Sequence, residues 1–208
     1  MRLSINLVDN LEEKTSKRTI RPAGIEAAGA TGDRLLAYRT PYGPGLLVWR
    51  GGLLAAHRLP GCHTEALLRR AAAGEPATAV EAGLAADLEA YFSGERILFD
   101  ALALPLDLGG YTRFRLDVAA ALAAVPYGRT VSYGGLAAAA GHPRAHRAVG
   151  TCMARNRFPL IIPCHRVIKG SGRLGNFASG KHWKERLLTM EGASLAGGVL
   201  LETAALKQ

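Results

Sequence analysis

Residues 161–167 constrain this chain more than any other stretch, because an apolar run meets a proline and then two reactive side chains. Residues 160–162 predict a short buried strand. The strand should end at Pro163, since proline has no N–H to give to a central ladder. Cys164 and His165 would then lie where the chain leaves the core, where a thiol can face a pocket.

A free cysteine is most often a small buried apolar residue, and that reading of Cys164 must be weighed first. Three features argue against it: an adjacent histidine, the strand stopped by proline, and a glycine-rich segment that follows. The glycines of that segment could form a loop over a pocket; they are Gly170, Gly172, Gly175 and Gly180. Together these features favour a nucleophilic cysteine.

Charge and cysteine content narrow the class of protein. The chain has 208 residues, enough for two small domains or one medium domain, and a formal net charge of +9. This charge favours a polyanionic partner, nucleic acid first, although a generally arginine-rich proteome explains the charge alone equally well. Cys62, Cys152 and Cys164 are odd in number and widely spaced, so we expect no disulfide framework and a reducing, cytoplasmic location.

The sequence predicts three regions. Residues 1–32 form a polar N-terminal arm, residues 33–105 an N-terminal α/β support domain, and residues 106–208 a C-terminal domain, with residues 105–110 as the linker. No apolar run reaches membrane-spanning length, and no apolar core of a signal peptide is present, so we expect no membrane association.

The support domain should contain strands at residues 35–38, 46–49 and 53–57, the last two joined by the hairpin signal Gly51-Gly52. Thr64 should cap a short helix, and a second helix should run over residues 80–92. His57, Cys62 and His63 lie close together, but no further ligand sits at zinc spacing. We therefore expect no metal.

The second domain contains a predicted helix-turn-helix. Thr112 should cap the first helix of this domain, and Ser132 should cap a short helix over residues 133–140. The chain should turn at Gly141 and then form another helix over residues 144–155. On that last helix one face is apolar, and the other carries a stripe suited to phosphate contact: Arg144, Arg147, Thr151 and Arg155. A stripe alone would more often be an ordinary solvated surface.

A C-terminal helix supplies an independent clue. Trp183, Leu187, Leu188 and Glu191 share one face, whereas Lys181, Lys184 and Glu185 should point towards solvent. A carboxylate on an apolar stripe is costly without a partner, and His165 is the obvious one.

These motifs resemble those of the O6-alkylguanine-DNA alkyltransferases, the suicide enzymes of direct DNA repair. The family motif Pro-Cys-His-Arg-Val stands unbroken at residues 163–167. The resemblance spans roughly residues 106–192, and its further matches are Ser132, Tyr133, residues 147–150, Asn156, residues 175–177, Lys184, Leu187, Leu188, Glu191 and Gly192. It implies a two-domain α/β (α+β) fold: a small N-terminal α/β domain with antiparallel hairpin strands, and a mostly helical C-terminal domain with a helix-turn-helix.

The resemblance also implies an activity. It is the irreversible, single-turnover transfer of an alkyl group, typically methyl, from O6-alkylguanine in duplex DNA to Cys164. Minor-groove binding and nucleotide flipping expose the base, no cofactor or metal is needed, and the protein acts as a monomer. O4-alkylthymine stays open as a second substrate.

Individual roles follow from the same resemblance. Cys164 is the nucleophile and alkyl acceptor, His165 a water-mediated base, and Glu191 the residue that orients it. Asn156 is a network and hinge residue, and Tyr133 gives a proton to guanine N3. A free thiol is only a few per cent thiolate at neutral pH, so the histidine must either lower the thiol pKa or take its proton.

The remaining implied residues contact substrate and DNA. Arg147 is the arginine finger that takes the place of the flipped base, and the other substrate-binding residues are Met153, Val167, Phe177 and Ala178. The DNA-binding set is Arg144, Ala145, Ala148, Gly150, Thr151 and Arg155. The chain departs from common family residues, without losing a catalytic group, at His146, Phe177, Ala178, Ser179 and Lys181.

Three other functions agree less well with the sequence. Alkyltransferase-like proteins bind alkylated guanine but lack the reactive cysteine, which Cys164 supplies here. Helix-turn-helix regulators of the adaptive response use a four-cysteine zinc domain, which three cysteines cannot provide. A cysteine hydrolase would need an oxyanion hole, for which the sequence gives no signal.

Overall fold

The computed structural model describes residues 32–74 and 76–202, whose contacts divide into two compact units between Gly110 and Tyr111. The boundary expected from the sequence, between residues 105 and 106, lies at the start of the predicted linker, and Gly110 lies at its end. The predicted polar arm, residues 1–32, falls outside the described residues except for its last one. None of the described helices is long and apolar enough to cross a membrane.

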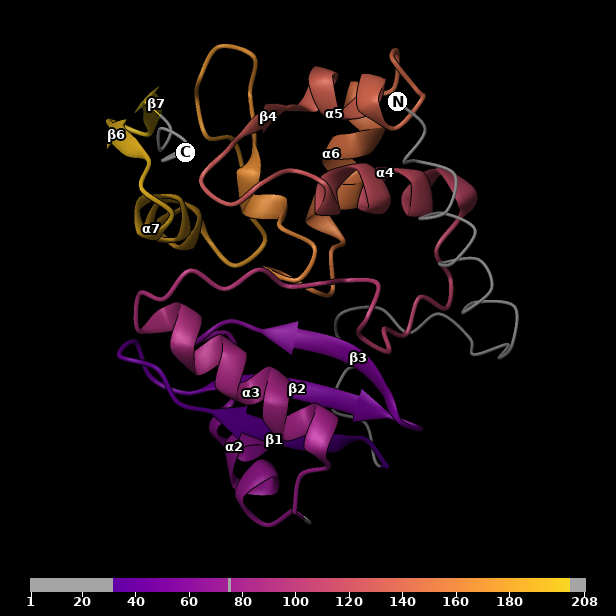
Figure 1. The fold of residues 1–208 in the computed structure, drawn as a ribbon, viewed down its shortest axis with the longest axis vertical. Helices are drawn as coiled ribbons and strands as arrows, with labels where there is room; N and C mark the ends of the chain where they lie inside the picture. Colours follow the sequence, from indigo (N-terminus) through magenta and orange to yellow (C-terminus); the bar gives the residue numbers. More distant parts are fainter. Residues whose placement is uncertain (1–31, 75, 203–208) are drawn as a thin grey trace. The chain divides into compact units, whose positions relative to one another are not determined.

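The N-terminal unit is a three-stranded antiparallel sheet with two helices (Figure 1). Its strands, in the order β1-β2-β3, and its helices are β1 (Arg34–Tyr38), β2 (Gly45–Arg50), β3 (Leu53–Arg58), α2 (Glu65–Ala72) and α3 (Ala79–Phe92). Gly51 and Gly52 both have positive φ, 55° and 79°, as a tight two-residue hairpin turn requires. The three predicted strands and their hairpin are therefore confirmed.

Both helices of this unit pack against β1. The α2 helix covers a core of sheet residues through its partly buried Leu67, Leu68 and Ala71. Thr64 stands at the N-cap of α2 as predicted, but its side chain accepts no capping hydrogen bond. A reciprocal capping box between Thr78 and Glu81 begins α3 instead, a signal that the sequence carried and the prediction missed.

The C-terminal unit is mostly helical, with short strands between and after the helices (Figure 1). Its elements are α4 (Arg113–Ala123), β4 (Val131–Ser132), α5 (Tyr133–Ala139), α6 (His146–Ala154), the 3-10 turn η2 (Cys164–Arg166), β5 (Val167–Ile168), α7 (Lys181–Met190), β6 (Ser194–Ala196) and β7 (Val199–Glu202). The hydroxyls of Thr112 and Ser132 accept from the backbone N–H groups of Arg115 and Gly135, so both predicted caps are confirmed. Helices α4, α5 and α6 pack together, and α5 and α6 form the helix pair.

Residues 160–162 form turns, so the strand predicted there is wrong. The apolar run is buried as expected, but its backbone groups form hydrogen bonds within a local loop. Ile162 N–H donates to Phe158 C=O, and the Asn156 side chain donates to Ile162 C=O. Leu160 adopts φ 69°, a left-handed conformation that a strand would not allow. The strand lies after the cysteine instead, where β5 pairs in parallel with β4.

Two further differences concern element boundaries and an unpredicted hairpin. Helix α6 begins at His146 with Ala145 as N-cap, two residues later than predicted. Strands β6 and β7 form an antiparallel hairpin that was not predicted from the sequence. Leu195 and Leu200 of this hairpin pack against a core that includes Leu174 and Leu188.

Candidate active site

A pocket of about 490 Å³ opens at Cys164 in the C-terminal unit. Its walls come from the start of α5, from α6 and from the loop that precedes α7. The lining residues are Tyr133, His146, Arg147, Gly150, Met153, Ala154, Cys164, Lys169, Gly175, Asn176, Phe177 and Ala178. The fold therefore brings the predicted nucleophile, arginine finger, tyrosine and loop residues to one cavity.

Val167 was predicted to contribute to substrate binding but is fully buried and does not line this cavity. Its carbonyl accepts a hydrogen bond from the Lys184 ammonium group. The predicted contact of Val167 with a substrate base therefore stays a prediction.

Cys164 is the first residue of η2 and is only 5% exposed. Burial raises the pKa of its thiol, while the hydrogen bond from Asn156 and the charge of Lys184 act in the opposite direction. Because the net direction is upwards, the resting side chain is a neutral thiol. A nucleophile in this state needs a group that takes its proton during the reaction.

Asn156 follows α6 and fixes the backbone around the cysteine. Its Nδ2 donates to the Ile162 carbonyl at 2.7 Å and lies 3.0 Å from Cys164 Sγ. Its Oδ1 accepts from the Phe158 N–H at 3.0 Å. One buried amide thus joins the end of the helix pair to the loop that carries the nucleophile, as the predicted network role requires.

His165 and Glu191 form the buried pair that the helical pattern of α7 predicted. His165 Nε2 lies 2.9 Å from Glu191 Oε1, and the two residues are 0% and 2% exposed. Burial lowers the pKa of His165, so the imidazole is neutral despite the adjacent carboxylate. With the Nε2 proton held by Glu191, the lone pair is on Nδ1, which has no hydrogen-bond partner among the described residues.

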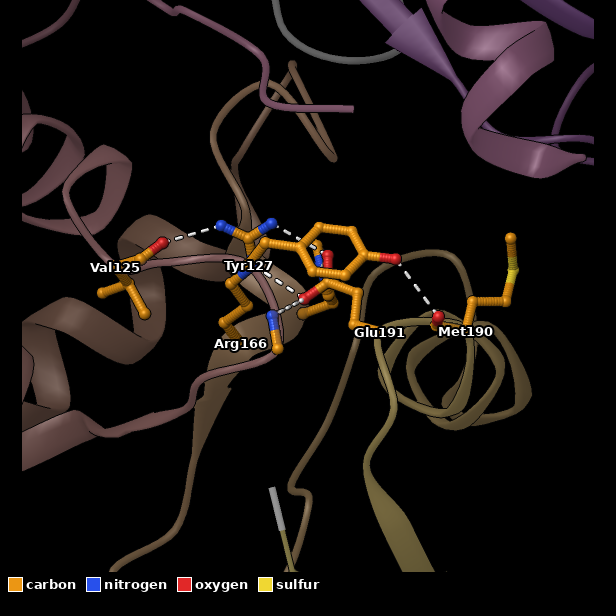
Figure 2. Close-up of polar contacts among 7 residues, drawn as sticks. Val125, Tyr127, Arg166, Met190 and Glu191 are labelled. Carbon is orange, nitrogen blue, oxygen red and sulfur yellow. Dashed lines mark hydrogen bonds and ion pairs between the residues drawn. The ribbon is translucent and has the colours of Figure 1, made fainter. Parts of the chain in front are cut away.

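Glu191 has more partners than the sequence indicated (Figure 2). Its carboxylate also accepts from Arg166 Nε and Nη2 at 2.9 and 2.8 Å, and from the Gly128 N–H at 3.1 Å. Burial by itself would raise the pKa of Glu191, but His165 and Arg166 more than offset it and hold that pKa well below its usual range. The carboxylate is therefore ionised in a buried site.

Lys184 was predicted to face solvent, and this was wrong because the residue is fully buried. Its ammonium donates to Val167 C=O and lies 5.9 Å from the centroid of the Tyr133 ring. Burial lowers the pKa of Lys184 to about 8. Its position four residues before Leu188 and seven before Glu191 puts it on the buried stripe, a signal that was available in the sequence.

Helix α6 exposes the basic face that the sequence predicted. Val149 is buried and Cys152 half-buried on the inner side of the helix. On the outer side Arg147, Ala148 and Thr151 are exposed, as are Arg144 in the turn before the helix and Arg155 at its C-cap, while Ala145 and Gly150 are half-buried. A line of cations on a helix face next to a pocket can contact a phosphate backbone.

No group of three or more His, Cys, Asp or Glu side chains within residues 32–74 and 76–202 is arranged to hold a metal ion. His57 instead pairs with Tyr38, whose hydroxyl lies 2.7 Å from His57 Nε2. The expectation that the protein needs no metal stays a prediction.

Comparison with known proteins shows similarity over the residues that form the pocket and its polar network. The family model "6-O-methylguanine DNA methyltransferase, DNA binding domain" matches residues 113–193, which contain the pocket and the polar network. The methylated-DNA–protein-cysteine methyltransferase of Methanosarcina acetivorans is 46% identical over 106 residues, which cover 51% of this chain and 65% of that protein. The protein of the same name from Methanopyrus kandleri is 44% identical over 108 residues, or 51% of this chain and 77% of that protein.

A solved structure extends the similarity beyond that region. The crystal structure of Mycobacterium tuberculosis OGT in complex with DNA matches with a TM-score of 0.61 and 35% identity. The match covers 76% of this chain and 93% of that one. The similarity therefore includes residues of the N-terminal unit as well as the pocket.

Proposed function

Because this chain belongs to the methylated-DNA–protein-cysteine methyltransferase family, we propose that it repairs DNA by moving an alkyl group from guanine O6 to its own Cys164. The observation that carries the proposal is a buried thiol at a pocket, held by Asn156 and followed by a histidine with a free Nδ1. The protein would act once per molecule, as a cytoplasmic monomer without a cofactor, on duplex DNA.

The proposed reaction is an in-line displacement at a saturated carbon. Sγ of Cys164 forms a bond to the alkyl carbon as the bond from that carbon to O6 breaks, and the bonding electrons pass to the guanine. The thiol proton passes through a bridging water to Nδ1 of His165, because the two side chains are not directly hydrogen-bonded. The guanine takes up one proton, for which Tyr133 at the pocket wall is the proposed donor. The thioether product is stable, so no turnover follows.

Access to O6 requires that the nucleotide leave the stack, which costs a few kcal/mol. We propose that the exposed face of α6 binds the DNA backbone in the minor groove, and that Arg147, which also lines the pocket, fills the space left by the base. Met153, Phe177 and Ala178 would contact the flipped base. O4-alkylthymine presents a similar alkoxy group, and it is a candidate second substrate.

The proposal is tested by measuring how much guanine is restored in a damaged duplex. A duplex that carries one O6-methylguanine is incubated with increasing protein, and its nucleosides are quantified after digestion. We expect guanine to be restored in an amount equal to the protein added, with no restoration by Cys164→Ala, which should still bind the duplex. Repeated turnover would contradict a suicide mechanism. Binding of the lesion without any restoration would instead indicate an alkyltransferase-like binding protein.

A further inference from the structure

Arg166 is a buried side chain next to the histidine whose guanidinium donates three hydrogen bonds, and no step described so far uses it (Figure 2). Its Nε and Nη2 donate to the two carboxylate oxygens of Glu191 at 2.9 and 2.8 Å. Its Nη1 donates to Val125 C=O at 2.7 Å, at the end of α4. The guanidinium is thus fixed at both ends, and a bidentate pair of this kind sets orientation as well as charge.

Tyr127 reinforces this arrangement from a second side (Figure 2). Its ring centroid lies 5.8 Å from Arg166 Cζ, and its hydroxyl donates to Met190 C=O at 3.2 Å. Met190 directly precedes Glu191, so the tyrosine fixes the backbone from which the carboxylate extends. The next residue in the chain, Gly128, gives its N–H to the same carboxylate.

The titratable and charged groups around His165 come from two elements and the residue that follows one of them. Arg166 and the neutral Cys164 thiol belong to η2, Lys184 lies on α7, and Glu191 follows α7. Glu191 is the single anion of this set that favours a charged imidazole, whereas Arg166 and Lys184 oppose it. Arg166 is also the residue that forms two hydrogen bonds with the anion itself.

We propose that Arg166 is a positioning residue for the transfer reaction: it aligns the Glu191 carboxylate and offsets its negative charge, so that Glu191 accepts the Nε2 proton of a neutral His165 and Nδ1 stays able to take the thiol proton. The inference rests on the proposed function. Arg166 does not line the pocket, so its influence on the rate passes through Glu191 and His165.

Loss of the Arg166 guanidinium should change the pH dependence of the transfer rate. In Arg166→Gln the negative charge of Glu191 is opposed less, so His165 should hold a second proton up to a higher pH. The base form then becomes scarce near neutrality and returns as the pH rises. Loss of a purely structural contact would lower the rate by the same factor at every pH.

The test compares the pH profile of single-turnover methyl transfer for the unaltered chain, Arg166→Gln, Arg166→Lys and the exposed control Arg173→Gln. For Arg166→Gln we expect the acid limb to move up by about one pH unit, which is about a tenfold greater loss below the limb than above it. The lysine variant keeps the charge and should retain the original limb with a lower rate. A profile of Arg166→Gln that falls uniformly would overturn the proposal.

A second measurement does not depend on activity. Nitrogen NMR of histidine-labelled protein, with His165 assigned by its loss in His165→Gln, reports which ring nitrogen carries a proton. At about pH 7 we expect a proton on Nε2 and none on Nδ1. A doubly protonated ring, or a proton on Nδ1, would overturn the inference. If the unaltered chain transfers no methyl group, the proposed function fails, and the spectrum still decides the state of His165.

Discussion

Asn156 Nδ2 lies 3.0 Å from Cys164 Sγ while donating to the Ile162 carbonyl at 2.7 Å, so one amide group contacts the nucleophile and holds the loop beside it. The same side chain accepts from the Phe158 N–H. Stability of the loop and reactivity of the thiol therefore depend on a single residue.

Removal of this amide should affect both properties. In Asn156→Ala the Ile162 carbonyl and the Phe158 N–H lose a buried partner, and we expect a loss of about 2 kcal/mol or more in the free energy of unfolding. The pKa of Cys164 should rise further, because the hydrogen bond from Asn156 lowers it. Urea denaturation and the pH dependence of thiol alkylation measure the two effects. Asn176→Ala, at an exposed pocket residue, is the control, and equal behaviour of the two variants would contradict this account.

Lys184 should make stability rise with pH in the alkaline range. Burial lowers its pKa from 10.5 to about 8, so between these values the unfolded chain binds more protons than the folded one. The free energy of unfolding should therefore rise by about 3 kcal/mol between about pH 8 and pH 10.5, and this rise should be absent from Lys184→Met. The comparison of the two proteins removes the opposite contribution of the buried tyrosines and cysteine. Lys181→Met, at an exposed position, should keep the slope of the unaltered chain.

Glu191 should make stability fall with acidification. Its pKa in the folded state is lower than the ordinary 4.5, so its contribution is complete above about pH 4.5 and is lost as the pH falls towards the folded value. Glu191→Gln should be less stable than the unaltered chain by about 3 kcal/mol near neutrality, because it breaks a buried ion pair. Urea denaturation at several pH values should show this gap narrowing below about pH 4.5. A gap that is constant with pH would contradict the assigned ionisation.

Arg147 should matter for duplex DNA more than for single strands. A flipped base leaves a gap only in a duplex, so Arg147→Ala should reduce methyl transfer there by about 10-fold to 100-fold, equivalent to a few kcal/mol. Transfer from single-stranded DNA should change little. Arg155→Ala, which removes an exposed cation outside the pocket, should weaken binding of all DNA and lower its salt dependence by about one unit of slope. Equal loss on both substrates for Arg147→Ala would contradict the finger role.

Two helix caps and a tight turn were predicted correctly from the sequence, because they depend on a few neighbouring residues. The caps at Thr112 and Ser132 and the hairpin at Gly51 were found because each depends on residues within three positions. The buried pair of His165 and Glu191 was found because an acid on an apolar stripe needs a partner. The caps and the hairpin have a short reach along the chain, whereas the pair joins distant residues and was found through the cost of burying a carboxylate without a partner.

Contacts between distant segments account for what was missed. Residues 160–162 are apolar enough for a strand, but a side-chain amide takes the place of a neighbouring strand. Helical spacing places Lys184 on the buried stripe of α7, but it does not reveal the distant carbonyl of β5 that accepts a hydrogen bond from the buried ammonium. The β6–β7 hairpin pairs with the loop before α7, where Leu174 N–H donates to Gly198 C=O and Leu200 N–H to Gly172 C=O.

The most direct test of the central claim is to identify which residue of the protein receives the alkyl group. Intact-mass spectrometry after reaction with an O6-methylguanine duplex, followed by peptide mapping, would identify the alkylated residue. We predict one added methyl group per molecule, located on Cys164, with Cys62 and Cys152 unmodified and no gain in Cys164→Ala. A methyl group on another residue, or an unchanged mass after the lesion has been bound, would contradict the proposed role of Cys164.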